Sequence, residues 1–196
     1  SFVQVDSDTY ALAYASAATA TNQEGFIATF TISSDGTTIT EVASLHHDTD
    51  HGSHNSLVQV DSDTYALAYA GENTDGYIST FTIDSDGDIT PIRIQNHAAF
   101  ESASANLEHD TTVAEWSSFI HVDSDIFALA YTGTGGDGFI STFTIDSDGV
   151  ITAVKTHAAG NNVEHTLDNV RHNALVKVDS ETLALAYNQM GTGGTG

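Results

Sequence analysis

The residues best suited to chemistry in this sequence are its histidines. Nine of the ten lie between one repeated segment and the next: His46, His47, His51, His54, His97, His109, His157, His165 and His172. His47 and His109 each precede Asp-Thr, whereas His54 and His172 each precede Asn and lead into a Leu-Val strand. Neutral imidazoles bind zinc, copper or nickel and can serve as acid and base. His47, His54, His109 and His172 are therefore candidate ligands for a transition metal or members of a catalytic pocket. The alternative is that these His-Asp and His-Asn pairs cap loops and pack between repeats.

A second set of candidate ligands lies in Asp-Ser-Asp-Gly stretches. The carboxylates concerned are Asp84, Asp86, Asp88, Asp146 and Asp148. Alternating carboxylates followed by glycine resemble the start of a calcium-binding loop, because a hard cation takes several oxygen ligands on a tight turn. The bidentate Glu that completes such a loop is absent, and the first copy has Ser33 in place of the leading Asp. The alternative is a hairpin turn in which the Asp side chains accept hydrogen bonds from their own backbone.

Other catalytic signatures are missing from the sequence. It has no cysteine, so neither disulfides nor thiolate metal sites are available. It also lacks a nucleophile elbow, a phosphate-binding glycine loop and an HExxH motif. We therefore expect no required cofactor, apart from the calcium ion or the His-bound transition metal considered above.

The composition limits the partners of this chain. Lys and Arg together number 4 against 27 Asp and Glu, which gives a formal net charge of −23 at pH 7. Nucleic acid is not an expected partner, because no cationic surface is available to displace counterions from phosphate. Membrane insertion is not expected either, since no apolar run approaches spanning length and an anionic bilayer would repel the chain. An acidic surface keeps its hydration at high ionic strength, which suggests a marine or saline source.

The positions of the candidate residues follow from an internal repeat. FVQVDSDTYALAYA from Phe2 recurs as LVQVDSDTYALAYA from Leu57, FIHVDSDIFALAYT from Phe119 and LVKVDSETLALAYN from Leu175. The aligned aspartates Asp6, Asp61, Asp123 and Asp179 are 55, 62 and 56 residues apart, and a second segment of the type GYISTFTIDSDGDIT occurs three times. We therefore divide the chain into units 1–55, 56–117 and 118–173, a half unit 174–190 and a flexible tail 191–196. Units of this size stack on their neighbours because they cannot bury their own faces.

Each whole unit is predicted to form four short antiparallel strands. In the second unit we expect strands at 57–60, 65–70, 76–83 and 89–94. Tyr65, Leu67 and Tyr69 alternate with alanines, so large side chains face one way and small ones the other. Because both faces are apolar, each sheet should be covered on both sides. In the first unit, residues 16–24 are expected to form a longer loop.

Four-stranded apolar sheets repeated at this spacing favour a β-propeller over a sandwich. The succession of a short strand, a VDSD turn, a YALAY strand, a Gly-rich loop and TFTIDSDGDIT resembles the blades of lactonase-type and YVTN-type propellers. The expected fold is all-β, with tandem four-stranded antiparallel blades of β-propeller type, three whole units plus a half unit. The resemblance implies that the connectors return the chain to a central axis, where equivalent histidines such as His54 and His172 would converge.

The half unit leaves the expected array with open ends. An unpaired sheet edge exposes backbone groups and invites association, and propellers usually remove it by closing the ring. We therefore expect a non-enzymatic extracellular or cell-surface protein with a structural or adhesive role. It would associate with itself or with further repeats of a longer parent chain. One alternative is a His-centred metal-binding or lyase- or lactonase-like propeller enzyme, and another is a calcium-dependent glycan-binding module.

Overall fold

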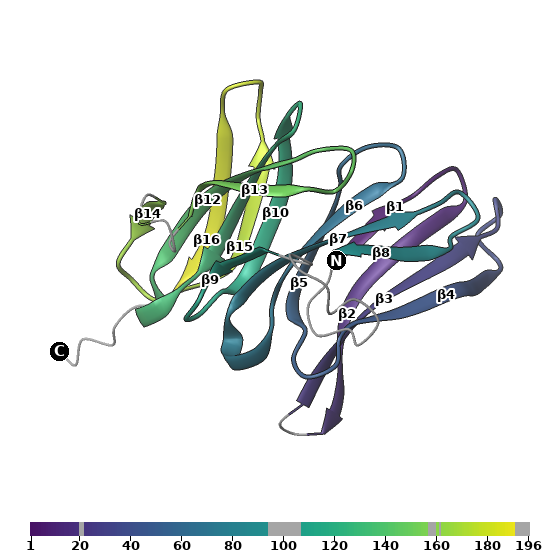
Figure 1. Cartoon of the computed structure of the whole chain (residues 1–196), viewed down its shortest axis with the longest axis horizontal. Coiled ribbons are helices and arrows are strands. Elements are labelled where there is room, and N and C mark those ends of the chain that lie inside the picture. The colour runs from purple at the N-terminus through teal and green to yellow at the C-terminus, as the bar shows by residue number, and fades with distance from the viewer. Residues whose placement is uncertain (20–21, 94–106, 157–159, 161, 191–196) are drawn as a thin grey trace.

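Four antiparallel sheets follow one another along the chain (Figure 1). The computed structural model describes residues 1–19, 22–93, 107–156, 160 and 162–190. Blade 1 consists of β1 (Phe2–Gln4), β2 (Thr9–Thr19), β3 (Asn22–Ile32) and β4 (Ile39–Asp48). Blade 2 consists of β5 (Ser53–Gln59), β6 (Thr64–Ala70), β7 (Gly76–Ile83), β8 (Ile89–Arg93) and β9 (Leu107–Asp110). Blade 3 consists of β10 (Glu115–Asp123), β11 (Ile126–Thr132), β12 (Gly138–Ile145), β13 (Ile151–Lys155) and β14 (Val163–Thr166).

The last sheet, here called the half-blade, contains β15 (Val170–Lys177) and β16 (Leu183–Gln189) within the described part of the chain. Single 3₁₀ turns, η1 (Glu72–Thr74) and η2 (Thr134–Gly136), join the second and third strands of blades 2 and 3. The expected all-β class, with three whole blades and a half unit, is therefore confirmed. The first strands of the sheets, β1, β5, β10 and β15, contact one another in chain order and are called the inner strands below.

The outer strand is continuous in blade 1 and divided in blades 2 and 3. In blade 1, β4 pairs with the whole of β3, from Ile32 opposite Ile39 to Gly25 opposite Asp48. In blade 2, β8 pairs with the end of β7, and β9 pairs with its start, where Gly76 lies opposite Asp110. The residues between β8 and β9 lie outside the described part of the chain. The longer second unit therefore reflects an insertion into the outer strand.

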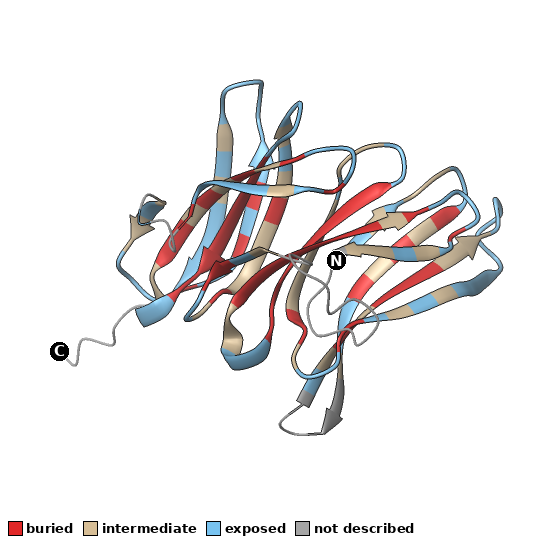
Figure 2. Ribbon diagram, viewed as in Figure 1, coloured by how far each residue is buried: buried red, intermediate tan, exposed pale blue. Residues whose placement is uncertain are grey.

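Each junction between blades joins a face of small side chains to a face of large ones. Blade 1 contributes Ala11 and Ala13 to the first junction, whereas blade 2 contributes Tyr65, Leu67 and Tyr69, all fully buried or nearly so. The other face of β6 carries alanines, which lie against the large side chains of β11 in blade 3. The buried residues accordingly run along the middle strands of the stacked sheets (Figure 2). The alternation along one strand thus supplies both halves of the stacking contact.

Two sequence-based expectations differ from the structure. Residues 16–24 do not form a longer loop, because β2 continues to Thr19 and β3 begins at Asn22, with Ser16 opposite Glu24 in the ladder. The inner strands begin at Ser53, Glu115 and Val170, a few residues before the predicted unit boundaries at 56, 118 and 174. The predicted tail, 191–196, lies outside the described residues. Within the described residues no helix is long and apolar enough to cross a membrane.

Candidate functional sites

One histidine lies at each junction between blades. The imidazole of His47 lies on Gly25, and that of His109 lies on Gly76, so closely that a Cβ on either glycine would be 2.3 to 2.5 Å from the ring Cε1. Each ring then meets a tyrosine of the next blade edge-on, at centroid distances of 4.6 Å for His47 with Tyr69 and 5.0 Å for His109 with Tyr131. His165 repeats the arrangement on Gly138 in the third unit. Glycine at this position of the third strand is therefore needed for the imidazole to fit.

Two of these junction histidines, His47 and His109, are buried and neutral, whereas His165 is half-buried. His47 and His109 are 0% and 1% exposed. Burial lowers the pKa of His47 to about 3, although Asn55 partly opposes the shift. Burial also lowers the pKa of His109 to about 4, with the neighbouring Asp110 acting in the opposite direction. His47 and His109 lie at different junctions, so the structure does not bring these two candidate metal ligands together.

The aspartates that follow these histidines organise the connecting loops. Asp48 Oδ1 accepts hydrogen bonds from the backbone N–H groups of Asp50 (2.9 Å) and His51 (3.0 Å). Asp110 Oδ1 accepts from the backbone N–H of Thr112 at 3.0 Å and from its hydroxyl at 2.7 Å. The Tyr131 hydroxyl donates to Asp110 Oδ2 at 3.1 Å, so this carboxylate also ties the loop to blade 3.

The Asp-Ser-Asp-Gly stretches form hairpin turns at the ends of blades 2 and 3. Asp84 Oδ1 accepts from the backbone N–H groups of Asp86 and Asp88, at 3.0 Å each, and Asp146 Oδ1 accepts from that of Val150 at 2.8 Å. Gly87 and Gly149 take the left-handed conformation, with φ of +89° and +73°. The five carboxylates considered for calcium are all exposed and are divided between two turns. Among the described residues, no group of three or more His, Cys, Asp or Glu side chains is arranged to hold a metal ion.

Each of these hairpins also docks on the preceding blade. Thr29 Oγ1 in blade 1 donates to the Gly87 carbonyl at 2.6 Å, and Thr80 Oγ1 in blade 2 donates to the Gly149 carbonyl at 2.9 Å. A second pair of threonines contacts the same turns: Thr9 Oγ1 donates to the Ser85 carbonyl at 3.2 Å, and Thr64 Oγ1 donates to the Ser147 carbonyl at 3.1 Å. Sequence reasoning missed these contacts, although the threonines recur at equivalent positions of the repeat.

Serines join the inner strands in the same direction along the array. The backbone N–H of Leu57 donates to Ser1 Oγ at 3.1 Å, that of Phe119 to Ser56 Oγ at 2.9 Å, and that of Leu175 to Ser118 Oγ at 2.9 Å. Each junction between blades is therefore fixed by an inner serine, a histidine and apolar packing, and the histidine is fully buried at the first two junctions. The two junctions that receive a complete blade add the threonine contacts.

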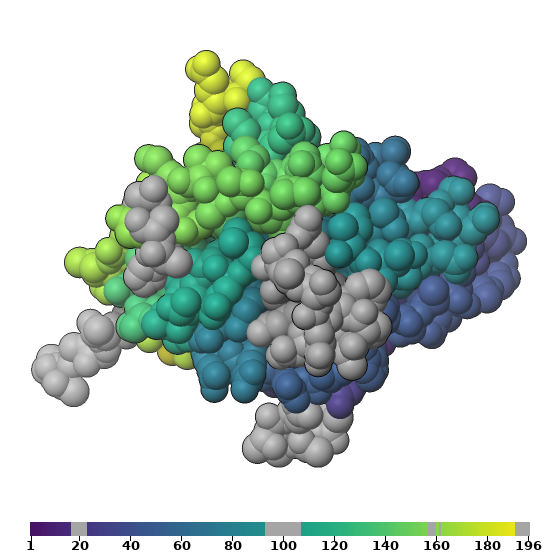
Figure 3. Space-filling view, in the orientation of Figure 1, coloured from purple at the N-terminus to yellow at the C-terminus, as the bar shows by residue number. Residues whose placement is uncertain are grey.

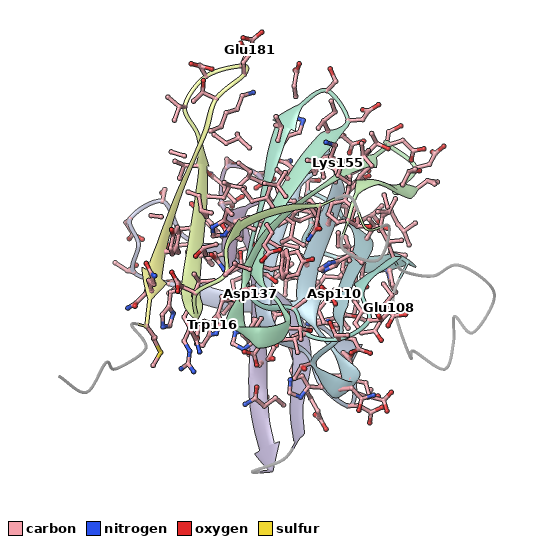
Figure 4. The ribbon with its side chains drawn as sticks, turned by 90° about the vertical axis from the view of Figure 1, so that its left-hand side faces the viewer. Glu108, Asp110, Trp116, Asp137, Lys155 and Glu181 are labelled. Carbon is pink, nitrogen blue, oxygen red and sulfur yellow. The ribbon has the colours of Figure 1, made fainter. Side chains whose placement is uncertain are left out.

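A row of three rings crosses the inner strands near their starts. Bulges in β5, β10 and β15 place His54, Trp116 and His172 in the left-handed region, with φ of 53°, 55° and 55°. The Trp116 ring lies between the two imidazoles, with centroid distances of 4.4 Å to His54 and 4.1 Å to His172. Trp116 and the turn at Glu181 occupy opposite ends of the blades (Figure 4). The bulge turns each ring out of the ladder toward its equivalent in the next blade.

These rings line a shallow pocket of about 360 Å³ together with Asn55, Ser117 and Asn173. His54 Nε2 lies 4.0 Å from Glu115 Oε1, while burial lowers the pKa of His54 and the Glu115 carboxylate partly opposes that shift. Asn173 Nδ2 donates to the Trp116 carbonyl and to Thr132 Oγ1, both at 3.2 Å. Of the four candidate histidines, the structure therefore places His54 and His172 in one pocket, with an indole between them, and His47 and His109 at separate junctions.

The two ends of the array expose apolar side chains that are covered elsewhere. Phe2 on β1 is 56% exposed, whereas its equivalents Leu57, Phe119 and Leu175 are 4 to 5% exposed. On the half-blade, Val176 is 55% exposed. In the space-filling view the yellow tip of the half-blade projects beside the turn between β10 and β11 (Figure 3). Each end of the array therefore carries an exposed apolar side chain at a position of the repeat that faces outward.

Comparison with known proteins identifies the scaffold. No protein-family model matches the chain, and neither does any curated protein sequence. The periplasmic gluconolactonase PpgL from Pseudomonas aeruginosa aligns with 95% of this chain and 56% of its own, with a TM-score of 0.61 and 10% identity. NanB sialidase from Streptococcus pneumoniae aligns with 97% of this chain and 27% of its own, with a TM-score of 0.60 and 11% identity. The scaffold is propeller-like. The chain spans about half or less of these neighbours, and at such low identity the likeness shows the fold alone.

Proposed function

We propose that this chain is a non-enzymatic repeat protein of the extracellular space or cell surface, with a structural or adhesive role, and that it associates through its open blade ends. The observation that carries the proposal is the pair of exposed end faces. Phe2 and Val176 are 56% and 55% exposed, whereas the equivalents of Phe2 inside the array, Leu57, Phe119 and Leu175, are 4 to 5% exposed because the preceding blade covers them. Exposed apolar patches mark interaction sites in soluble proteins.

The charge of the chain sets the conditions for this association. With a formal net charge of −23, two copies repel each other at low ionic strength. Salt screens that repulsion over distances beyond about 10 Å at 0.1 M, whereas the apolar contact is not weakened by screening. Saline surroundings therefore favour association, which agrees with an acidic protein that acts outside the cell.

The activities of the sialidase and of the gluconolactonase are not transferred to this chain. Both proteins share its blade architecture at 10 to 11% identity, and one fold supports many unrelated sites. His54 and His172 lie on either side of an indole, and among the described residues no group of three or more His, Cys, Asp or Glu side chains is arranged to hold a metal ion. Assembly through the blade ends is better supported than chemistry in the pocket.

Sedimentation velocity tests the proposal on the intact chain. Samples from about 1 µM to about 500 µM, with EDTA present and with NaCl either low or near 0.5 M, cover the range of weak to moderate self-association. We expect the weight-average sedimentation coefficient to rise with concentration, and to rise more at high salt. A single monomeric species under all these conditions would contradict the proposal.

A further inference from the structure

The exposed face of blade 1 is the large-side-chain half of a blade junction. Its residues Phe2, Tyr10, Leu12 and Tyr14 occupy the positions that Leu57, Tyr65, Leu67 and Tyr69 hold in blade 2. In blade 2 these four side chains are buried against the alanines of blade 1. In blade 1 the same face is half-exposed or exposed, and Phe2 stacks on Tyr10 with ring centroids 5.4 Å apart.

The exposed face of the half-blade is the small-side-chain half of the same junction. Leu183 and Leu185 point toward blade 3, where they pack against Ala128 and Ala130. Because side chains alternate along a strand, Ala184 and Ala186 point the other way, and both are exposed. Their equivalents in blade 2, Ala66 and Ala68, are fully buried under the aromatic face of blade 3.

A threonine position indicates what kind of neighbour the half-blade accepts. Thr9 and Thr64 each donate to the Asp-Gly hairpin of the following blade. Blade 3 carries Ile126 at this position, and Ile126 is 44% exposed. The sheet that follows blade 3 is the half-blade, whose described residues include no such hairpin. The half-blade has threonine again, at Thr182. The half-blade therefore has, at Thr182, the residue that binds the hairpin of a following complete blade at the internal junctions.

We infer that blade 1 of a second copy of this chain docks on the half-blade, head to tail. Phe2 and Tyr10 of one copy would lie over Ala184 and Ala186 of the other. Thr182 Oγ1 would donate to the carbonyl of Ser34 in the blade 1 hairpin, which is equivalent to Ser85 and Ser147. The inference rests on the proposed function, for which it names the partner and the polarity. It is supported by continuity with the junctions already present inside the chain.

The geometry of the array makes this contact intermolecular. Blade 1 and the half-blade stand at opposite ends of the stacked sheets, so the two faces of one chain do not meet (Figure 1). The two surfaces differ, so the contact is heterologous and generates rings or open filaments rather than a symmetric dimer. β1 and β2 of one copy cover the half-blade of the next, and β3 and β4 extend beyond it.

One residue distinguishes this contact from the internal junctions. Ser1, Ser56 and Ser118 each accept the N–H of the next inner strand, but the fourth position is Ala174. The N–H of Phe2 from the neighbouring copy therefore finds no hydroxyl there. Restoring it with Ala174→Ser should tighten association about two- to tenfold, which corresponds to one added hydrogen bond.

Two variants that each block one face test the polarity. Phe2→Asp places a charge on the large face, and Ala184→Glu places one on the small face. Each variant alone should associate at least about tenfold more weakly than the original chain, because either change buries a charge in an apolar contact. Leu167→Asp, at a position 78% exposed in the loop before β15, is the matched control and should associate normally. Far-UV circular dichroism and melting curves establish that all three remain folded.

Mixing the two blocked variants gives the decisive measurement. The intact large face of Ala184→Glu can still bind the intact small face of Phe2→Asp. Sedimentation velocity of the mixture at high salt should therefore show dimers and no larger species. Association of the original chain with no dimer in the mixture overturns the head-to-tail contact while leaving the proposed function standing. Association that is unaffected by Ala184→Glu, through the free edge of β16 for example, overturns it as well. A chain that is monomeric throughout refutes both.

Discussion

Lowering the pH from about 7.5 to about 5 should destabilise the fold through the two imidazoles buried at blade junctions. The pKa of His47 is lowered by burial to about 3 and that of His109 to about 4, against an ordinary value of 6.5. Between these values the unfolded chain binds more protons than the folded one. Stability from these groups is therefore fully present above about pH 6.5 and is lost as the pH falls toward 4 and 3.

The size of the effect follows from the pH interval. Each pH unit below 6.5 costs about 1.4 kcal/mol per buried imidazole until the folded-state pKa is reached. At about pH 5 both groups remain neutral in the folded state, so each removes about 2 kcal/mol of unfolding free energy. Burial raises the pKa of Asp48, and protonation relieves the net negative charge, so these effects act in the opposite direction.

Comparing variants isolates the histidine contribution. Urea unfolding, followed by far-UV circular dichroism and by the fluorescence of Trp116, the one tryptophan of the sequence, gives the unfolding free energy at each pH. The difference between the original chain and His109→Gln should shrink by about 2 kcal/mol from pH 7.5 to pH 5. His121→Gln, at an exposed position on β10, is the control for losing an imidazole that is not buried. A difference for His109→Gln that does not change with pH would refute the buried neutral imidazole.

Two substitutions test the contacts that stack the blades. Gly76→Ala should lower the unfolding free energy by about 1 to 3 kcal/mol, because the new Cβ would lie 2.5 Å from both His109 Cε1 and the Ala114 Cβ. An unchanged midpoint of urea unfolding would show that the imidazole does not lie on this glycine. Thr80→Val should cost about 1 to 2 kcal/mol by removing the buried 2.9 Å hydrogen bond to the Gly149 carbonyl. The equivalent half-buried Thr142→Val should cost less than about 0.5 kcal/mol, and equal losses at the two positions would contradict hairpin docking.

Much of each blade could be predicted because its signals are local. The strands expected at 65–70 and 76–83 match β6 and β7 within one residue, since alternation and β-branched content are properties of the strand itself. The loop expected at 16–24 is wrong because the alanines and polar residues of this stretch show no alternation typical of a strand. Residues 16–19 and 22–24 are extended because β2 and β3 continue to pair, with Ala15 opposite Gly25 and Ser16 opposite Glu24.

The candidate sites were predicted less completely. Alignment of the repeat placed His54 and His172 at equivalent positions, but only the bulges and their positive φ angles show that the two imidazoles form one row with the Trp116 ring between them. His47 and His109 had the same spacing signal as the pocket histidines, and the structure instead places them at separate junctions. Their burial depends on a glycine in the adjacent strand and a tyrosine in the next blade, which no single motif contains.

The sequence by itself determined which side of each strand is large or small, where the hairpins turn, and that the units repeat. Those properties depend on backbone geometry and side-chain size within a few residues. Only the tertiary structure decided which partners meet across a junction, such as Thr29 with the Gly87 carbonyl 58 residues away and Thr80 with that of Gly149. The physical reason is that these contacts depend on how one sheet lies on the next. That relation is set by packing between whole blades and is not carried by the preference of any one segment.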